Sequence, residues 1–274
     1  MKIAKYLGFG LFFCSLLLLA LPVQAFGETN RYLIRSSSIL TRKAVGSVRH
    51  DFGDSFSADL TPFQLRVARM FGDVERVGQL AISAPTPTQS RDIARTFQES
   101  SDQKSVVVAI LDTGFGAEDD NGHGTAMAEI IASIGNPKLV SYKVCNKQGY
   151  CFSDDVAAAI RLAADAKVNI INMSFGSEQL SPLIATAIKY AADHGVLLVA
   201  AAGNNGPFAD SVEYPARYPL VTAVGALDHN GILAQWSSQG KVDAWEIGEY
   251  KTIAGTSVAA AYFTARSAKL LAHD

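Results

Sequence analysis

Residues 106–114 read Val-Val-Val-Ala-Ile-Leu-Asp-Thr-Gly, an unbroken apolar run that ends on a carboxylate and a glycine. Further apolar runs of this kind lie at residues 139–144, 168–173 and 196–202. Such runs are typical of strands that are buried on both faces of a parallel sheet. Helical patterns separate them at residues 153–166 and 181–194. Strands that alternate with helices predict a three-layer α/β/α domain with a mostly parallel sheet.

The start of the chain has the pattern of a signal peptide. Lys2 and Lys5 precede an apolar stretch that ends in Val23-Gln24-Ala25, a small-x-small cleavage site. We therefore expect a leader over residues 1–25 and an exported protein, extracellular or periplasmic, with no membrane contact after leader removal. A permanent membrane anchor is the alternative. The formal net charge of -2, with both signs mixed along the chain, gives no reason to expect a nucleic-acid partner.

Cysteine usage agrees with export. Removal of the leader removes Cys14 and leaves Cys145 and Cys151, which predict one disulfide across a short polar loop. Two free thiols are the alternative. A metal site is not expected there, because no further cysteine and no suitably spaced histidine lies nearby.

The chain divides into a smaller and a larger unit. Residues 27–82 predict a small α+β domain, in which Thr61-Pro62-Phe63-Gln64 has the pattern of a helix start with a capping box and residues 74–82 of a strand. Prolines and hydroxyl residues at 84–89 indicate an exposed linker. We therefore expect a linker and mature N-terminal segment at residues 83–104 and the α/β domain at residues 105–274.

Polar residues stand where predicted strands end or helices begin, the place where such sheets bind ligands. Asp112 ends the first run, His123 precedes a predicted helix over residues 126–134, Asn204 follows a later strand, and Ser257 starts the last helix. Singly, each has an ordinary explanation as a turn or capping residue. Together they offer a serine, a base that can take its proton and a carboxylate that fixes the base.

These segments resemble the subtilisin-like serine proteases, the subtilases of peptidase family S8. The resemblance covers residues 90–274 and rests on Ala-Ile-Leu-Asp-Thr-Gly at 109–114, Gly-His-Gly-Thr at 122–125, Ala-Ala-Gly-Asn at 201–204 and Gly-Thr-Ser at 255–257. Ser-Tyr-Lys-Val at 141–144 and Asn-Met-Ser-Phe-Gly at 172–176 also match. The chain order Asp, His, Ser is the one that this family uses.

The resemblance implies a secreted serine endopeptidase that acts on proteins or peptides. Asp112, His123 and Ser257 would form the triad, with the Asn204 side chain and the Ser257 backbone N–H as oxyanion donors. The segment Ser174, Phe175 and Gly176 would pair with the substrate backbone, with Gly149 and Tyr150 on its other side. Phe175 would line the pocket for the residue before the scissile bond, with an apolar preference. The cysteine bridge would clamp the loop that forms one wall of this cleft.

Residues 27–82 are similar to the inhibitory pro-domain of this family in shortened form, and we expect no early helix after Arg35. The protein would then be a zymogen whose own pro-domain is a partner, and cleavage is expected in or near residues 78–90. No cofactor is implied. Calcium is possible, but no calcium ligand can be assigned, and Asp119 and Asp120 are interpreted as solvated acids. The remaining histidines, His50 among them, are interpreted as surface or capping residues.

The spacing of 11 residues between Asp112 and His123 is tight for the family. A catalytically inactive peptide-binding module with the same fold is therefore the competing hypothesis. An esterase of the nucleophile-elbow type is disfavoured, since Gly-x-Ser-x-Gly is absent around Ser257.

Overall fold

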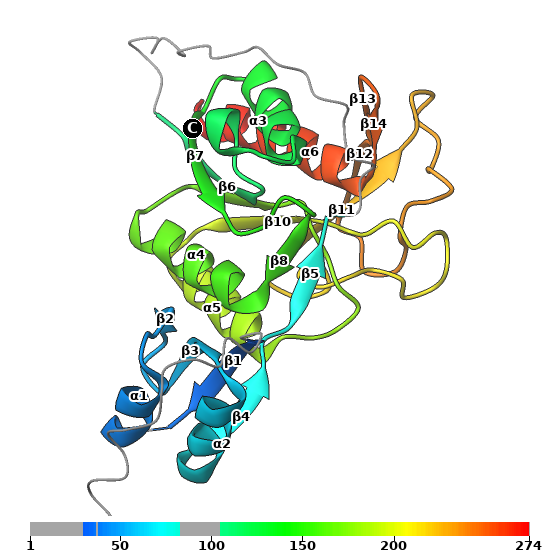
Figure 1. Cartoon of the computed structure of the whole chain (residues 1–274). Helices are drawn as coiled ribbons and strands as arrows, with labels where there is room; N and C mark the ends of the chain where they lie inside the picture. Colours follow the sequence, from blue (N-terminus) through cyan, green and yellow to red (C-terminus); the bar gives the residue numbers. More distant parts are fainter. Residues whose placement is uncertain (1–29, 37, 83–104, 274) are drawn as a thin grey trace, which may run out of the picture.

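The computed structural model describes residues 30–36, 38–82 and 105–273. The predicted leader and the predicted linker at residues 84–89 lie outside these ranges. The described residues form a larger α/β unit and a smaller N-terminal unit, which sits beside the larger one below α4 and α5 (Figure 1). No helix among the described residues is long and apolar enough to cross a membrane.

The larger unit is built on a six-stranded sheet with the order β12-β11-β10-β9-β6-β7. Every pairing in it is parallel, as the apolar runs predict. The strands are β6 (Val107–Asp112), β7 (Lys138–Lys143), β9 (Ile170–Met173), β10 (Leu197–Ala201), β11 (Thr222–Leu227) and β12 (Ala244–Ile247). The strand order turns back between β9 and β6, so the carboxyl ends of these two strands form a natural binding position.

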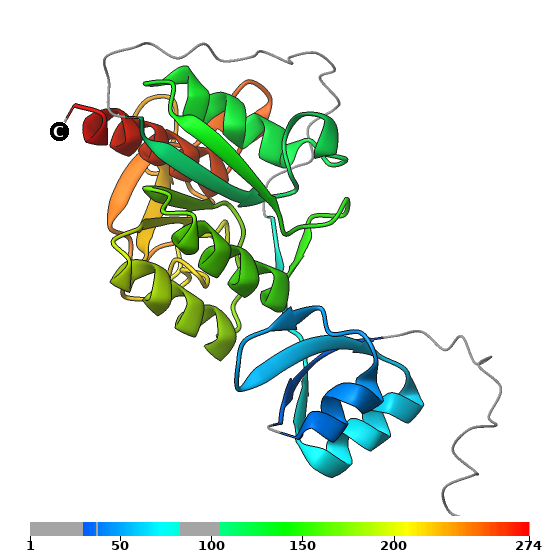
Figure 2. The ribbon, with the colours of Figure 1, turned by 90° about the vertical axis from the view of Figure 1, so that its left-hand side faces the viewer.

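Helices cover both faces of this sheet (Figures 1 and 2). One face carries α3 (His123–Ser133) and α6 (Thr256–Leu271), and the other carries α4 (Ser153–Asp165) and α5 (Pro182–Asp193). Each pair encloses an apolar core of its own against the sheet. The α/β/α architecture is therefore confirmed. The helix predicted at residues 126–134 begins earlier, at His123 itself.

The N-terminal unit is an antiparallel sheet with two helices on one face. Its strands are β1 (Asn30–Arg35), β2 (His50–Asp51), β3 (Ser55–Leu60) and β4 (Asp73–Arg76), in the order β2-β3-β1-β4. The capping box is present at the start of α2 (Pro62–Phe71), where Thr61 and Gln64 bond reciprocally. The expected absence of an early helix is wrong, because α1 (Ile39–Val45) follows β1. Ile34, Phe56 and Leu60 form the core beneath these helices.

The single strand expected at residues 74–82 is also wrong, because this stretch is split between two sheets. Val77 still donates its N–H to Arg31, but Gly78 accepts a bond from Ser153 of the larger unit. Beyond this crossing, β5 (Gln79–Ala81) pairs antiparallel with β8 (Tyr150–Phe152). A short 3₁₀ helix η1 (Gly116–Glu118) and a small ribbon of β13 (Glu249–Tyr250) and β14 (Ile253–Ala254) complete the elements.

Candidate active site

Asp112 and His123 meet at the carboxyl end of β6. Asp112 is the last residue of β6 and His123 the first of α3, and both side chains are buried. His123 Nδ1 lies 2.7 Å from Asp112 Oδ1, which also accepts a 2.8 Å bond from the N–H of Thr113. Because a carboxylate only accepts, Nδ1 carries the imidazole proton and Nε2 is left as the proton acceptor.

The short segment between these residues is organised by Asp119, which is half-buried. Its Oδ1 accepts bonds from Thr113 Oγ1 and Gly122 N, and its Oδ2 accepts from both N and Oγ1 of Thr125. Burial favours the neutral form of Asp119, but these hydrogen bonds outweigh it and lower the pKa of the carboxyl. The interpretation of Asp119 as a solvated acid is therefore wrong: it ties both ends of the segment together and sets the start of α3.

Asp120 behaves as expected of a solvated acid. Its exposed carboxylate pairs with Lys143 Nζ at 2.7 Å, which holds the pKa of Asp120 below its usual value. Of these two neighbouring acids, Asp120 forms only a surface ion pair, whereas Asp119 supports the segment that carries the buried His123.

Ser257 is the second residue of α6, whose N-terminus points at the same edge of the sheet. It is buried, and its Oγ donates a 3.1 Å hydrogen bond to the carbonyl of Ser174, directly after β9. His123 Nε2 is also buried and has no hydrogen-bond partner among the described residues. In this structure the serine hydroxyl is thus bonded to the segment after β9 rather than to the imidazole.

Asn204 lies beyond the end of β10 and is oriented by Thr256. The Asn204 Oδ1 atom accepts from Thr256 N at 2.9 Å and from Thr256 Oγ1 at 3.0 Å. Thr256 Oγ1 in turn accepts the N–H of Gly203. This network turns the carbonyl end of the amide towards Thr256 and its NH₂ end away from it. Thr256 is a positioning residue that the sequence reasoning did not single out.

The chain's own residues 79–82 lie between β8 and the segment after β9, the two sides of the expected cleft. Ala81 and Gly176 exchange two backbone hydrogen bonds of 2.9 Å, and Ile82 donates its N–H to Gly149 at 3.0 Å. Tyr150 faces Ala81 in the β5–β8 register. The cleft residues named from the sequence therefore lie on both sides of an extended segment, with Phe175 buried in the core beneath.

The wall formed by residues 145–151 is closed by a disulfide between Cys145 and Cys151. Within this loop, Asn146 donates its N–H to Tyr150 and Gly149 donates its N–H to Asn146. Gly149 has a φ of 83°, a left-handed conformation that glycine adopts without strain, and its carbonyl is the acceptor for Ile82.

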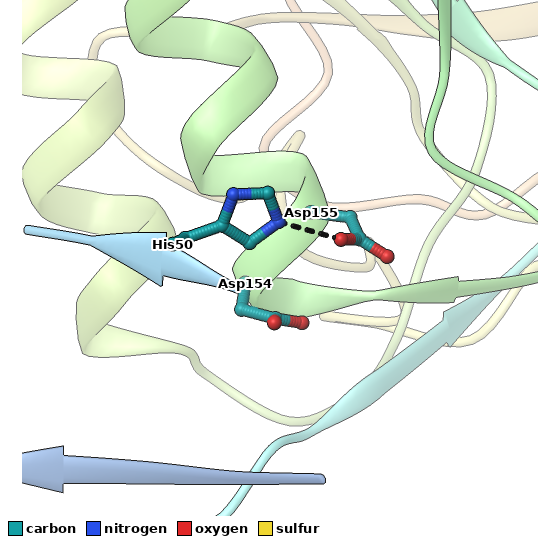
Figure 3. A group of neighbouring side chains, drawn as sticks. All are labelled: His50, Asp154 and Asp155. Carbon is teal, nitrogen blue, oxygen red and sulfur yellow. Dashed lines mark hydrogen bonds and ion pairs between the residues drawn. The ribbon is translucent and has the colours of Figure 1, made fainter. Parts of the chain in front are cut away.

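A group of potential metal ligands lies elsewhere, where the N-terminal unit meets α4 (Figure 3). His50 Nε2 is 2.7 Å from Asp155 Oδ1, so His50 is an interface residue and not simply a surface one. Arg31 Nη1 lies 3.0 Å from Asp154 Oδ1 and 2.6 Å from Asp155 Oδ2. A guanidinium already occupies these carboxylates, so the group fits an ion-pair network better than a cation site.

The chain is similar to known proteins of one family. The profile of the subtilase family matches residues 115–274. The chain is 34% identical over 214 residues to a subtilisin of Bacillus sp. strain TA39, covering 62% of the chain and 51% of that protein. It is 30% identical over 268 residues to a thermostable alkaline protease of Halalkalibacterium halodurans, covering 82% of the chain and 74% of the relative.

A solved structure, the S41 psychrophilic protease, superposes with a TM-score of 0.57 at 30% identity, covering 62% of the chain and 77% of that protein. The chain thus spans about half the length of the Bacillus subtilisin and about three quarters of the alkaline protease and of the psychrophilic protease. From the profile match and these similarities, the chain belongs to the subtilase family.

Proposed function

We propose that the protein is an exported serine endopeptidase that is made as a zymogen and cleaves peptide bonds through an acyl-enzyme on Ser257. The observation that carries this proposal is the extended segment at residues 79–82. It adds a strand between Gly149 and Gly176 and runs towards Ser257, as a bound substrate would.

In the proposed reaction, Ser257 Oγ leaves the carbonyl of Ser174 and attacks the carbonyl carbon of the scissile bond while its proton passes to His123 Nε2. Asp112 holds the imidazole and stabilises its charged form. The negative oxygen that develops is bound by the Asn204 side-chain amide and the Ser257 N–H, at the positive end of α6. Collapse expels the amine, which takes the proton from His123, and water then hydrolyses the ester with His123 again as base.

The N-terminal unit, residues 27–82 in this proposal, acts as the inhibitory pro-domain. Besides the strand in the cleft, it docks on the first turn of α4 through Arg31, Arg49 and His50 against Asp154 and Asp155. Burial favours the neutral form of Asp155, but the bonds from His50 and Arg31 outweigh it and lower its pKa. Carboxylates in the first turn are further stabilised by the helix dipole.

Export rests on the leader pattern of residues 1–25, and we propose an extracellular or periplasmic location from it. N-terminal sequencing of the protein recovered from the medium or periplasm tests this. A start after Ala25, or further along after processing, supports it, whereas an intact Met1 in the cell pellet contradicts it.

The competing function is an inactive peptide-binding module, which the bond from Ser257 Oγ to the Ser174 carbonyl favours. Hydrolysis of a casein or peptide substrate by the wild type and by Ser257→Ala separates the two. Turnover that is lost in the variant supports the protease. Equal peptide binding by both proteins without turnover supports the module.

A further inference from the structure

Glu213 is a buried acid that the proposed reaction does not use. Only 8% of its surface is exposed. Its N–H bonds to the carbonyl of Ala202, at the end of β10, and its neighbour Tyr214 exchanges two backbone bonds with Ser177, after β9. The Glu213 backbone is therefore fixed to both of the segments that flank Ser257.

The Glu213 side chain lies in the slot between these segments. A Cβ at Gly176 would overlap Glu213 Oε2, and a Cβ at Gly203 would lie 2.9 Å from its Cγ. Gly176 comes two residues after Ser174, which bonds to Ser257, and Gly203 directly precedes Asn204. The carboxyl thus lies between the segment that bonds Ser257 through Ser174 and the segment that carries Asn204, and both glycines are needed to make room for it.

The Glu213 carboxyl has no counter-charge among the described residues. Asn205 Nδ2 donates to Glu213 Oε1 at 2.7 Å, but Oε2 is buried and has no hydrogen-bond partner within the described ranges. No lysine, arginine or histidine described by the structure forms an ion pair with Glu213. The exposed Glu178 adds a second negative charge nearby. Burial raises the pKa of Glu213, the Asn205 bond lowers it, and Glu178 raises it further.

A buried carboxylate that lacks a partner is costly, and a bound cation with hydrogen-bond donors removes that cost. Lysine and arginine have long apolar stems that can pass between two glycine-lined walls and carry their charge to the base of a slot. Apolar side chains would leave the carboxylate unpaired. A basic side chain therefore fits this position better than the apolar side chain that Phe175 suggested.

We propose that Glu213 determines specificity by pairing with a lysine or arginine side chain at the substrate residue whose carbonyl is attacked. This inference rests on the proposed protease function, because it assigns the substrate class of the same site. Ser257 and His123 act on the backbone carbonyl, and Glu213 acts on the side chain of the same residue.

The test compares peptides that differ only at that residue, with Lys, Arg, Phe or Ala. For the wild type, kcat/KM is expected to be highest with Lys or Arg. In Glu213→Gln, which keeps the size of the side chain, the Lys-to-Phe ratio of kcat/KM is expected to fall at least tenfold. Glu178→Gln, which changes the exposed acid nearby, is the control and should lower the ratio less.

Binding keeps this test separate from the catalytic proposal. In the Ser257→Ala background the Lys peptide should bind more tightly than the Phe peptide, and the added Glu213→Gln change should abolish the difference. An unchanged Lys-to-Phe ratio, or a preference for Ala with Glu213 blocking the slot, would overturn the inference. Absence of turnover with the Lys preference intact in binding would overturn the protease function alone.

Discussion

Ala81 and Gly176 exchange two backbone hydrogen bonds of 2.9 Å each, which joins the N-terminal unit to the edge of the candidate cleft. The Gly176 side of this pair leads back within two residues to Ser174, whose carbonyl holds Ser257 Oγ. The Ala81–Gly176 pairing therefore directs residues 79–82 towards the candidate nucleophile Ser257. It also fixes a register from which a cleavage site can be predicted.

Antiparallel partners advance in opposite directions, so a peptide in this register presents the residue two positions after Ala81 opposite Ser174. That residue is Ser83, which lies outside the described residues. Because serine carries no cation to pair with Glu213, this intramolecular cut is expected to depend on the register of the attached segment and not on the Lys or Arg preference. We predict cleavage between Ser83 and Ala84, inside the interval expected from the sequence. N-terminal sequencing of the purified protein checks this, and Ser257→Ala should stay uncut. A new terminus further away than a few residues would show that the register is not the productive one.

The ion pairs between the N-terminal unit and α4 should hold the cleaved pro-domain in place. Asp155→Asn removes the negative charge that His50 and Arg31 face and replaces one of its two acceptor oxygens by an NH₂ group, and hydrogen bonds to charged groups contribute about 1.5–3 kcal/mol. We expect the lag before full activity to shorten roughly tenfold or more, which corresponds to about 1.4 kcal/mol. Added salt should shorten the wild-type lag as well.

The control for this change is Asp193→Asn, which breaks an exposed pair with Lys189 on α5. Such surface pairs contribute about 0–1 kcal/mol, so its lag should match the wild type. Equal lags for Asp155→Asn and Asp193→Asn would contradict the docking role of the network.

The disulfide should support the cleft wall and not the fold as a whole. The double variant Cys145→Ser/Cys151→Ser avoids a lone thiol, and we expect it to raise KM several-fold with a smaller effect on kcat. For so short a loop the chain-entropy contribution is only about 2 kcal/mol, so a cooperative thermal transition should persist. Kinetics identical to the wild type would show that the loop keeps its shape without the bond.

Asp119 should support the active site through the position of His123. Asp119→Asn brings an NH₂ group against N–H and O–H donors. We therefore expect the free energy of unfolding to fall by roughly 2 kcal/mol and kcat/KM to fall as well. In a domain of this size that lowers the melting temperature by about 4–8 °C. The adjacent Asp120→Asn, which removes only an exposed pair with Lys143, is the matched control and should change neither quantity measurably.

The pH dependence of this effect has a defined sign. Because the pKa of Asp119 is lowered in the folded protein, its contribution to the free energy of unfolding is present above the free-Asp value of about 3.9. It is lost as pH falls through the lowered folded-state value. The difference in melting temperature between wild type and Asp119→Asn should therefore shrink below about pH 4. A difference that grows on acidification would contradict the assignment.

The sequence predicts the sheet because its strands carry their own signal. The apolar runs that end at Asp112 and near Asn204 are typical of buried strands, and their polar ends mark one edge of a parallel sheet. β11 and β12 were not predicted. The apolar stretch of β11 contains Gly225, and the four residues of β12 are partly exposed and include Glu246. α1 was not predicted because it has only seven residues, with Arg42 and Lys43 in its last turn. So short a segment does not show a clear helical repeat of apolar residues.

The site residues that the sequence missed depend on contacts between distant segments. In the sequence Asp119 resembles any surface acid, and only the structure shows the bonds that it accepts from Thr113 and Thr125. Glu213 also resembles a surface acid in the sequence, and only the structure shows that it lies against Gly176 and Gly203. The split of residues 74–82 likewise depends on β8, some seventy residues later in the chain. Local pattern singled out Asp112, His123 and Ser257 as candidates because each lies in a short motif of its own.

The most direct test of the central claim is the intact mass of the leaderless protein before and after reaction with a fluorophosphonate probe, beside Ser257→Ala. We predict a single adduct on the wild type alone, on a species that begins at Ala84, and an unlabelled, uncut variant. A folded and correctly processed wild type that takes up no probe, or a Ser257→Ala variant that is labelled equally, would contradict Ser257 as the nucleophile.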